Sequence, residues 1–186
     1  MKLRYLPNIL TISRLLLIIP FLMCLYRSHY VNAFYLFLLA GFTDGLDGFL
    51  ARHYHWQTFF GSFIDPLADK LLIASSFISL ALMGKLPWWL VILVFLRDIT
   101  ISFGVLAWYR FVQKKLDFHP TYISKLNTFF QLVLVTTCLF ELAFFDFPLK
   151  LQQALIILTA ITTACTYVDY VWTWGKEACS KIQISK

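Results

Sequence analysis

Six apolar stretches divide this chain, and each is long enough to cross a lipid bilayer. The hydrocarbon core of a bilayer is about 30 Å thick, and an α-helix crosses it in about 20 residues. The stretches cover residues 7–26, 31–51, 61–83, 87–112, 124–144 and 149–172. They are unbroken and lack the alternation of a membrane barrel. The sequence therefore predicts an all-α integral membrane protein with six transmembrane helices.

The composition of the chain agrees with this fold. Of its 186 residues, 60% are hydrophobic and only 14% are charged. A soluble domain with this composition would have too little polar surface to cover its apolar residues. The sequence has no internal repeat, low-complexity segment or linker. We therefore expect residues 1–186 to form a single transmembrane domain.

The basic residues are distributed unevenly between the two ends of the expected helices. One side would carry Lys2, Arg4, Arg52, Arg110, Lys114, Lys115, Lys125, Lys176, Lys181 and Lys186, and the other would carry Arg27, Lys85 and Lys150. Cytoplasmic loops are richer in Lys and Arg, so this bias predicts that both termini are cytoplasmic. The net charge of +6 follows from the same bias and suits anionic headgroups. No nucleic-acid partner is needed to explain it.

Four aspartates lie where the second apolar stretch ends and the third begins: Asp44, Asp47, Asp65 and Asp69. The members of each pair are three or four residues apart, so on helices each pair would share one face. A short cytoplasmic turn at residues 53–58 would bring the two faces together. Charged residues are costly inside a membrane and mark function there. The sequence therefore predicts a cluster of four carboxylates.

The residues around these aspartates favour a metal site that handles phosphate. Carboxylates without His or Cys suit Mg²⁺ or Mn²⁺, which often complete their shell with substrate phosphates. Two ions would balance the four charges, and paired ions clamp the attacking and leaving oxygens in displacement at phosphorus. Gly48 and Ala51 leave room beside the carboxylates, and Arg52 can hold a phosphate. The indicated chemistry is phosphoryl-group transfer.

The complete pattern, D-x2-D-G-x2-A-R-x8-G-x3-D-x3-D, resembles the signature of the CDP-alcohol phosphatidyltransferase family at every fixed position. The resemblance implies transfer of a phosphatidyl group from CDP-diacylglycerol to an alcohol, with release of CMP. It implies that all four aspartates bind metal and that Asp69 is also the general base. It further implies a homodimer. The residues that would line the cytidine diphosphate are Asp47, Gly48, Ala51, Arg52 and Gly61.

Three basic residues outside the signature are candidates for holding an anionic acceptor: Arg97, Arg110 and Lys125. Lys125 would lie near the positive end of the fifth helix, with Ser124 as its N-cap. The pair at 97–98 and the stretch 123–128, with Gln131 following, resemble the eukaryotic-type cardiolipin synthases of the family. The resemblance implies phosphatidylglycerol as the acceptor.

Phosphatidylglycerophosphate synthases are similar throughout the signature and at residues 7–14, so glycerol 3-phosphate is the alternative acceptor. Unlike the eukaryotic enzymes, the chain begins almost directly at its first expected helix, without an Arg- and Ser-rich transit segment. We therefore expect a multi-pass protein of a bacterial inner membrane, with its site opening to the cytoplasm.

Structural explanations compete with these assignments. The aspartates could form buried ion pairs that only fix helix packing, with Lys70, Arg14 or Arg52 as partners. Arg97 could pair with a cluster aspartate or with Asp98, although adjacent residues on a helix do not face each other. Lys125 could extend toward phosphates at the membrane surface.

Two other functional classes also use acidic residues inside a membrane. A divalent-cation transporter would need no Gly48-to-Arg52 arrangement, and such proteins usually contain two related halves with interrupted helices, which this sequence lacks. An aspartate-rich prenyltransferase also grips diphosphate through magnesium, but its two acidic motifs lie far apart in the chain. Here a single short turn separates the motifs.

Overall fold

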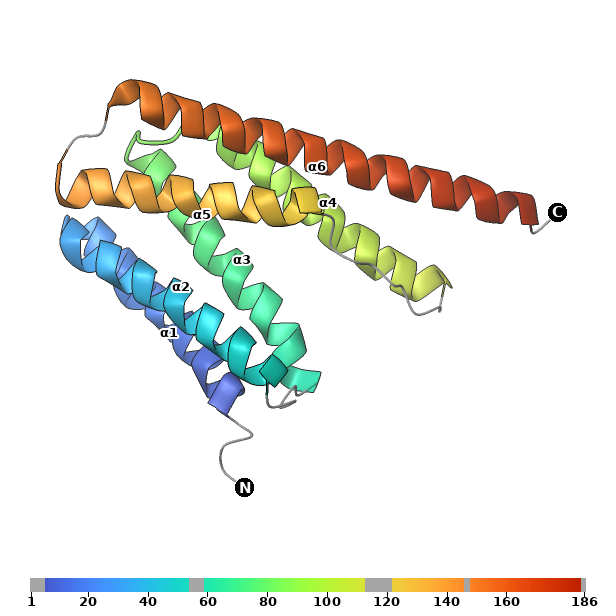
Figure 1. Cartoon of the computed structure of the whole chain (residues 1–186), viewed down its shortest axis with the longest axis horizontal. Helices are drawn as coiled ribbons and strands as arrows, with labels where there is room; N and C mark the ends of the chain where they lie inside the picture. The colour runs from blue at the N-terminus through green and yellow to red at the C-terminus, as the bar shows by residue number, and fades with distance from the viewer. Residues whose placement is uncertain (1–5, 54–58, 113–121, 146–147, 185–186) are drawn as a thin grey trace. The chain divides into compact units, whose positions relative to one another are not determined.

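The computed structural model describes the backbone of residues 6–53, 59–112, 122–145 and 148–184, and the side chains of residues 12–45, 67–102, 122–145 and 148–170. The described part is all-helical (Figure 1). Its helices are α1 (Leu6–Tyr26), α2 (Tyr30–His53), α3 (Phe59–Leu82), α4 (Trp88–Val112), α5 (Tyr122–Ala143) and α6 (Leu149–Ile184). The predicted all-α fold is confirmed.

The ends of the helices follow the apolar stretches closely until the last one. Helices α1 to α5 begin and end within two residues of the predicted bounds. Helix α6 begins at Leu149 as predicted but continues to Ile184, well beyond residue 172. Its last part contains Lys176, Glu177 and Ala178, which favour helix without being apolar enough to mark a membrane span. The predicted end of the sixth helix was therefore wrong.

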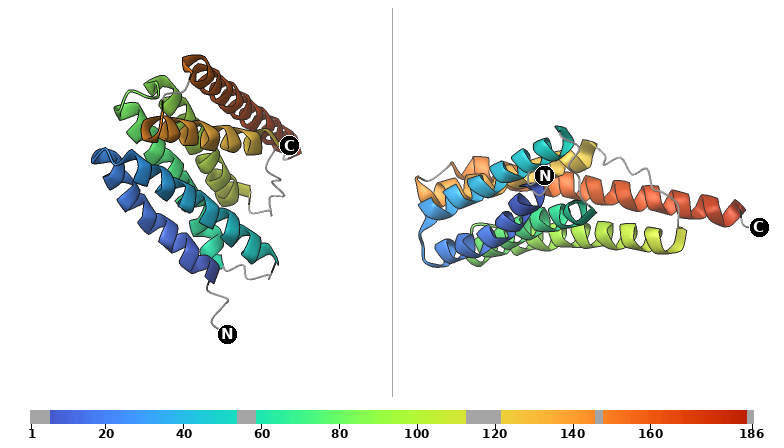
Figure 2. Two further views of the ribbon diagram at one scale, coloured as in Figure 1. Left: turned by 60° about the vertical axis from the view of Figure 1, so that its left-hand side comes forward. Right: turned by 90° about the horizontal axis from the view of Figure 1, so that it is seen from below.

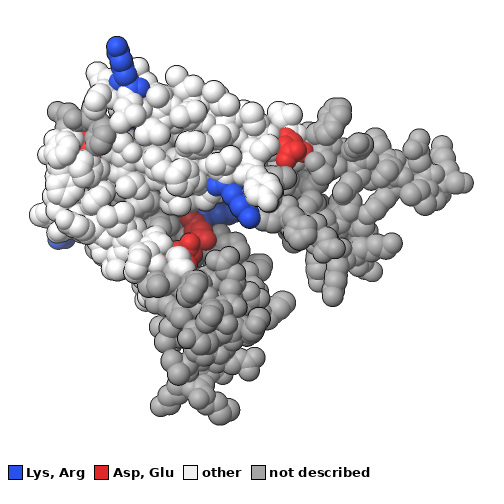
Figure 3. Space-filling view, in the orientation of Figure 1, with Lys and Arg blue, Asp and Glu red and all other residues white. Residues whose placement is uncertain are grey.

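The described surface is suited to a lipid environment. Two segments, Tyr122–Ala143 and Leu149–Tyr170, are long and apolar enough to cross a membrane. Most of the described surface on the face drawn in Figure 3 is neither acidic nor basic. Large apolar side chains are exposed on every helix, among them Leu16, Phe42, Leu82, Ile92, Phe129 and Val168. These observations are consistent with a membrane protein, and six spans with cytoplasmic termini stay a prediction.

The chain divides into two compact units, one of residues 1–86 and 135–152 and the other of residues 87–134 and 153–186. In the first unit, α1 packs against both α2 and α3 (Figure 1 and Figure 2). Its core contains Phe21 and Phe37, whose ring centroids are 5.9 Å apart. In the second unit, Leu90 of α4 and Leu134 of α5 are fully buried. That residues 1–186 act as a single domain stays a prediction.

A glycine turn at the end of α3 fixes a polar contact in the first unit. Gly84 has a φ of 73°, which glycine adopts without steric strain. The next N–H, of Lys85, donates to the carbonyl of Leu80 at 2.9 Å, as in a Schellman C-cap. This turn places Lys85 Nζ 2.8 Å from Glu141 Oε1 of α5. The ion pair therefore ties the end of α3 to α5.

Candidate active site

Asp44 of α2 and Asp69 of α3 come together around one guanidinium group. Nη1 of Arg14, on α1, lies 2.8 Å from Asp44 Oδ1 and also donates to Asp69 Oδ1. The Arg14 side chain is fully buried, whereas those of Asp44 and Asp69 are 43% and 42% exposed. The structure therefore brings together one aspartate from each predicted pair, with an accessible side on each carboxylate.

Burial of Arg14 follows from the packing of the first unit. Helix α1 packs against α2 and α3, and Arg14 lies where a charge without compensation would be costly. The two carboxylates supply that compensation. The ion pairs with Arg14 that we kept as a structural explanation are thus present. Sequence reasoning treated Arg14 only as a packing partner, although a lone arginine inside the first apolar stretch was the available signal.

The donor set at this point fits a hard divalent cation. Two carboxylate oxygens converge on a single nitrogen position, and ionised carboxylates only accept hydrogen bonds or bind cations. Oxygen ligands of this kind suit Mg²⁺ and Mn²⁺. The side chains of Asp44 and Asp69 are partly exposed, so a ligand can reach both carboxylates.

The remaining residues of the signature are placed by the backbone only. Asp47 follows Asp44 by three residues on α2, and Asp65 precedes Asp69 by four on α3, as the predicted shared faces require. The side chains of Asp47 and Asp65 lie outside the described part, which by itself contains no group of three potential metal ligands. Gly48, Ala51, Arg52 and Gly61, which were predicted to line the nucleotide, also lie outside the range over which side chains are described. Their roles stay predictions.

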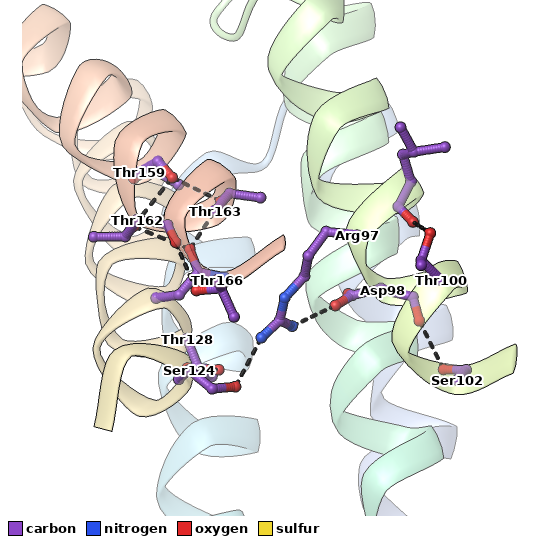
Figure 4. Close-up of polar contacts among 12 residues, drawn as sticks. Arg97, Asp98, Thr100, Ser102, Ser124, Thr128, Thr159, Thr162, Thr163 and Thr166 are labelled. Carbon is purple, nitrogen blue, oxygen red and sulfur yellow. Dashed lines mark hydrogen bonds and ion pairs between the residues drawn. The ribbon is translucent and has the colours of Figure 1, made fainter. Parts of the chain in front are cut away.

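Arg97, predicted to hold the acceptor, is buried in the second unit and contacts two side chains. Its Nη1 lies 2.7 Å from Asp98 Oδ1, and its Nη2 donates to Ser124 Oγ of α5 at 2.7 Å (Figure 4). Our expectation that Asp98 is not its partner was wrong, because the long arginine side chain folds back to its neighbour. The N-cap assignment of Ser124 was also wrong, because α5 begins at Tyr122 and Ser124 lies in its first turn.

Lys125 and Arg110 are the other two acceptor candidates. Lys125 is exposed, and its Nζ lies 5.7 Å from the centroid of the Tyr122 ring. It remains available to a phosphate at the membrane surface. The side chain of Arg110 lies outside the described residues. Of the two candidates whose side chains the structure describes, Arg97 is the one whose contacts link two helices.

Comparison with known proteins decides the family. The family model described as CDP-alcohol phosphatidyltransferase matches residues 4–166. The chain belongs to the CDP-alcohol phosphatidyltransferase family. It is therefore a phospholipid-synthesising transferase, as the signature predicted, and the family match does not support the transporter or the prenyltransferase.

Relatives within the CDP-alcohol phosphatidyltransferase family carry both of the expected activities in their names. A probable phosphatidylglycerophosphate synthase of Mycobacterium tuberculosis is 37% identical over 173 residues, which cover 89% of this chain and 79% of the relative. The cardiolipin synthase (CMP-forming) of Homo sapiens is 31% identical over 192 residues, covering 95% of this chain and 64% of the relative. A probable cardiolipin synthase (CMP-forming) of Drosophila melanogaster is 35% identical over 180 residues, which cover 89% of this chain and 56% of the relative.

Proposed function

We propose that this transferase moves the phosphatidyl group of CDP-diacylglycerol to phosphatidylglycerol, forming cardiolipin and releasing CMP. The phosphoryl-transfer chemistry is supported chiefly by one observation: the carboxylates of Asp44 and Asp69 both contact Arg14 and so lie close together. The acceptor rests on the stretches at 97–98 and 123–131, which resemble cardiolipin synthases. Glycerol 3-phosphate is the second candidate acceptor, favoured by the 37% identity to the bacterial phosphatidylglycerophosphate synthase.

All six helices cross the membrane in this proposal, with both termini and the site on the cytoplasmic side. Each helix has at least 21 residues, which is enough to span the hydrocarbon core. The charged residues within the helices, such as Asp44, Asp69 and Arg97, are of the kind that membranes contain only where function needs them. The bacterial relative supports a bacterial inner membrane as the location. We also expect a homodimer.

Asp44, Asp47, Asp65 and Asp69 would hold Mg²⁺ or Mn²⁺, as two ions. Such ions would neutralise the diphosphate of the donor. Asp69 accepts the proton of the acceptor hydroxyl, which its exposed side permits. The acceptor oxygen then forms a bond to the phosphatidyl phosphorus while the bond from phosphorus to CMP breaks, and CMP keeps the electron pair. Arg14 holds Asp69 in position for this transfer.

The remaining predicted residues bind rather than react. Gly48, Ala51, Arg52 and Gly61 would line the nucleotide together with Asp47, and Arg97, Arg110 and Lys125 would attract the anionic acceptor. The acyl chains of the donor stay in the lipid while its nucleotide occupies the polar site. No lipid substrate has to leave the bilayer.

We expect purified protein to release CMP from CDP-diacylglycerol only when a divalent cation and a glycerol-containing acceptor are both present. The assay offers phosphatidylglycerol and glycerol 3-phosphate singly and in competition, and identifies the lipid products by mass. Cardiolipin as the dominant product supports the proposal. Phosphatidylglycerophosphate as the dominant product would replace the first acceptor by the second, and folded protein that releases no CMP with either would refute both.

A further inference from the structure

Three hydrogen-bond donors are buried without a partner in the described part of the second unit: Arg97 Nε, Asn127 Nδ2 and Gln131 Nε2. The exposed fractions of these residues are 6%, 0% and 3%. Buried donors are almost always paired, because a donor removed from water without a new partner loses the whole of its hydration. Three unpaired donors in one unit indicate a ligand that carries hydrogen-bond acceptors.

These donors follow one line along the protein. Ser124, Asn127 and Gln131 are separated by three and four residues, so they share one face of α5. Arg97 reaches this face from α4 through its bond to Ser124 (Figure 4). We call Arg97, Ser124, Asn127 and Gln131 the α5 polar strip. From Ser124 to Gln131 it extends about 10 Å, at a rise of about 1.5 Å per residue.

Contacts with α6 fix the middle of the α5 polar strip. The hydroxyl oxygens of Thr162 and Thr163 lie 3.0 Å and 2.8 Å from Asn127 Oδ1, and each also lies within hydrogen-bond distance of a backbone carbonyl of α6. With its oxygen held by α6, the amide of Asn127 directs Nδ2 elsewhere, and this nitrogen has no partner. The strip is therefore a positioned set of donors.

The strip has a charged end and a neutral end, and this polarity matches one class of ligand. The Arg97 guanidinium can contact a phosphate through Nε, which has no partner, while Nη1 stays on Asp98 and Nη2 on Ser124. Asn127 and Gln131 can donate only neutral hydrogen bonds, which suit ester oxygens. In a glycerophospholipid, the phosphate is followed by a glycerol that bears two esters. In glycerol 3-phosphate, the phosphate is the end of the molecule.

We infer that the α5 polar strip binds a lipid acceptor lengthwise, with its phosphodiester at Arg97 and its ester oxygens at Asn127 and Gln131. Gln131 then distinguishes phosphatidylglycerol from glycerol 3-phosphate, because only the lipid reaches beyond the phosphate. This inference rests on the proposed function and adds residues that select the acceptor. Neither Asn127 nor Gln131 belongs to the aspartate signature.

The test is Gln131→Met, which keeps the length of an unbranched side chain and removes the donor. The KM for phosphatidylglycerol rises about five- to tenfold, the value of one hydrogen bond, while kcat changes less than about twofold. The KM, or the inhibition constant, of glycerol 3-phosphate stays unchanged. Because the replaced amide has an unpaired donor, the unfolding temperature in detergent stays the same or rises. Gln153→Met, the same substitution at an exposed position of α6 outside the stretch 123–131, is the matched control and changes none of these values.

Each other outcome overturns the inference. A Gln131→Met variant with unchanged KM for both acceptors would show that the Nε2 of Gln131 contacts neither of them. Equal weakening of both acceptors, or a lower unfolding temperature with no selective kinetic change, would assign Gln131 a structural role. Wild-type protein that makes no cardiolipin would remove the proposed acceptor together with this inference. If the wild-type protein makes cardiolipin and the Gln131→Met variant behaves as the wild type does, the proposed acceptor stands and only this inference fails.

Discussion

Asp69→Asn lowers the kcat for CMP release by about two to four orders of magnitude, the usual contribution of a general base. The amide has nearly the same shape as the carboxylate but cannot accept the hydroxyl proton. It also removes one negative charge from the predicted metal site. Binding of CDP-diacylglycerol persists in part, because the other predicted ligands remain. The measurement is CMP release at saturating donor, with donor binding measured separately.

A matched control separates this effect from a general loss of charge. Asp169→Asn makes the same substitution on α6, at a residue that is not part of the signature, and should retain wild-type turnover. The unfolding temperature of both variants shows whether each is folded. Turnover of Asp69→Asn close to that of the wild type would show that another group takes the proton.

Arg14→Gln lowers the free energy of unfolding by about 2–3 kcal/mol, somewhat less than the about 3–5 kcal/mol typical of breaking a fully buried ion pair. Arg14 is fully buried, but Asp44 and Asp69 are partly exposed and retain some hydration without it. Without the Arg14 guanidinium, the carboxylates of Asp44 on α2 and Asp69 on α3 lie close together and repel each other. Denaturant unfolding in detergent measures the change.

The same variant reports on the nature of the site. Because a divalent cation would take over the charge of the lost guanidinium, added Mn²⁺ should raise the unfolding temperature of Arg14→Gln more than that of the wild type. Arg27→Gln, at an exposed position in the turn after α1, is the control and should be nearly neutral. Stability of Arg14→Gln equal to that of the wild type would mean that Arg14 does not hold the two carboxylates together.

The helices could be predicted because lipid-length apolar stretches leave few alternatives for the backbone. The prediction failed where hydropathy stops being informative, at residues 173–184, which stay helical although polar residues alternate there with apolar ones. Helix propensity continues there without the apolar signal. Spacing and the short turn at 53–58 predicted that the two aspartate faces would come together, and Asp44 and Asp69 both contact Arg14. That Asp47 and Asp65 join them stays a prediction.

The partners within each site could not be predicted in the same way. Three cations were possible partners for the aspartates, and the packing of α1 against α2 and α3 is what places Arg14 against Asp44 and Asp69. The helical-face rule misled for Arg97 and Asp98, because it places Cβ atoms and ignores the reach of a long side chain. The unpaired donors of Asn127 and Gln131 depend on burial, which the order of residues does not reveal.

Binding of Mn²⁺ to the purified protein, followed by electron paramagnetic resonance, tests most directly whether α2 and α3 share a divalent-cation site. Wild-type protein should bind the ion, and Asp44→Asn and Asp69→Asn should each weaken its affinity by about tenfold or more, since each removes a carboxylate ligand. Asp169→Asn should bind it as the wild type does. Undiminished Mn²⁺ affinity in both signature variants would contradict a shared metal site between these helices.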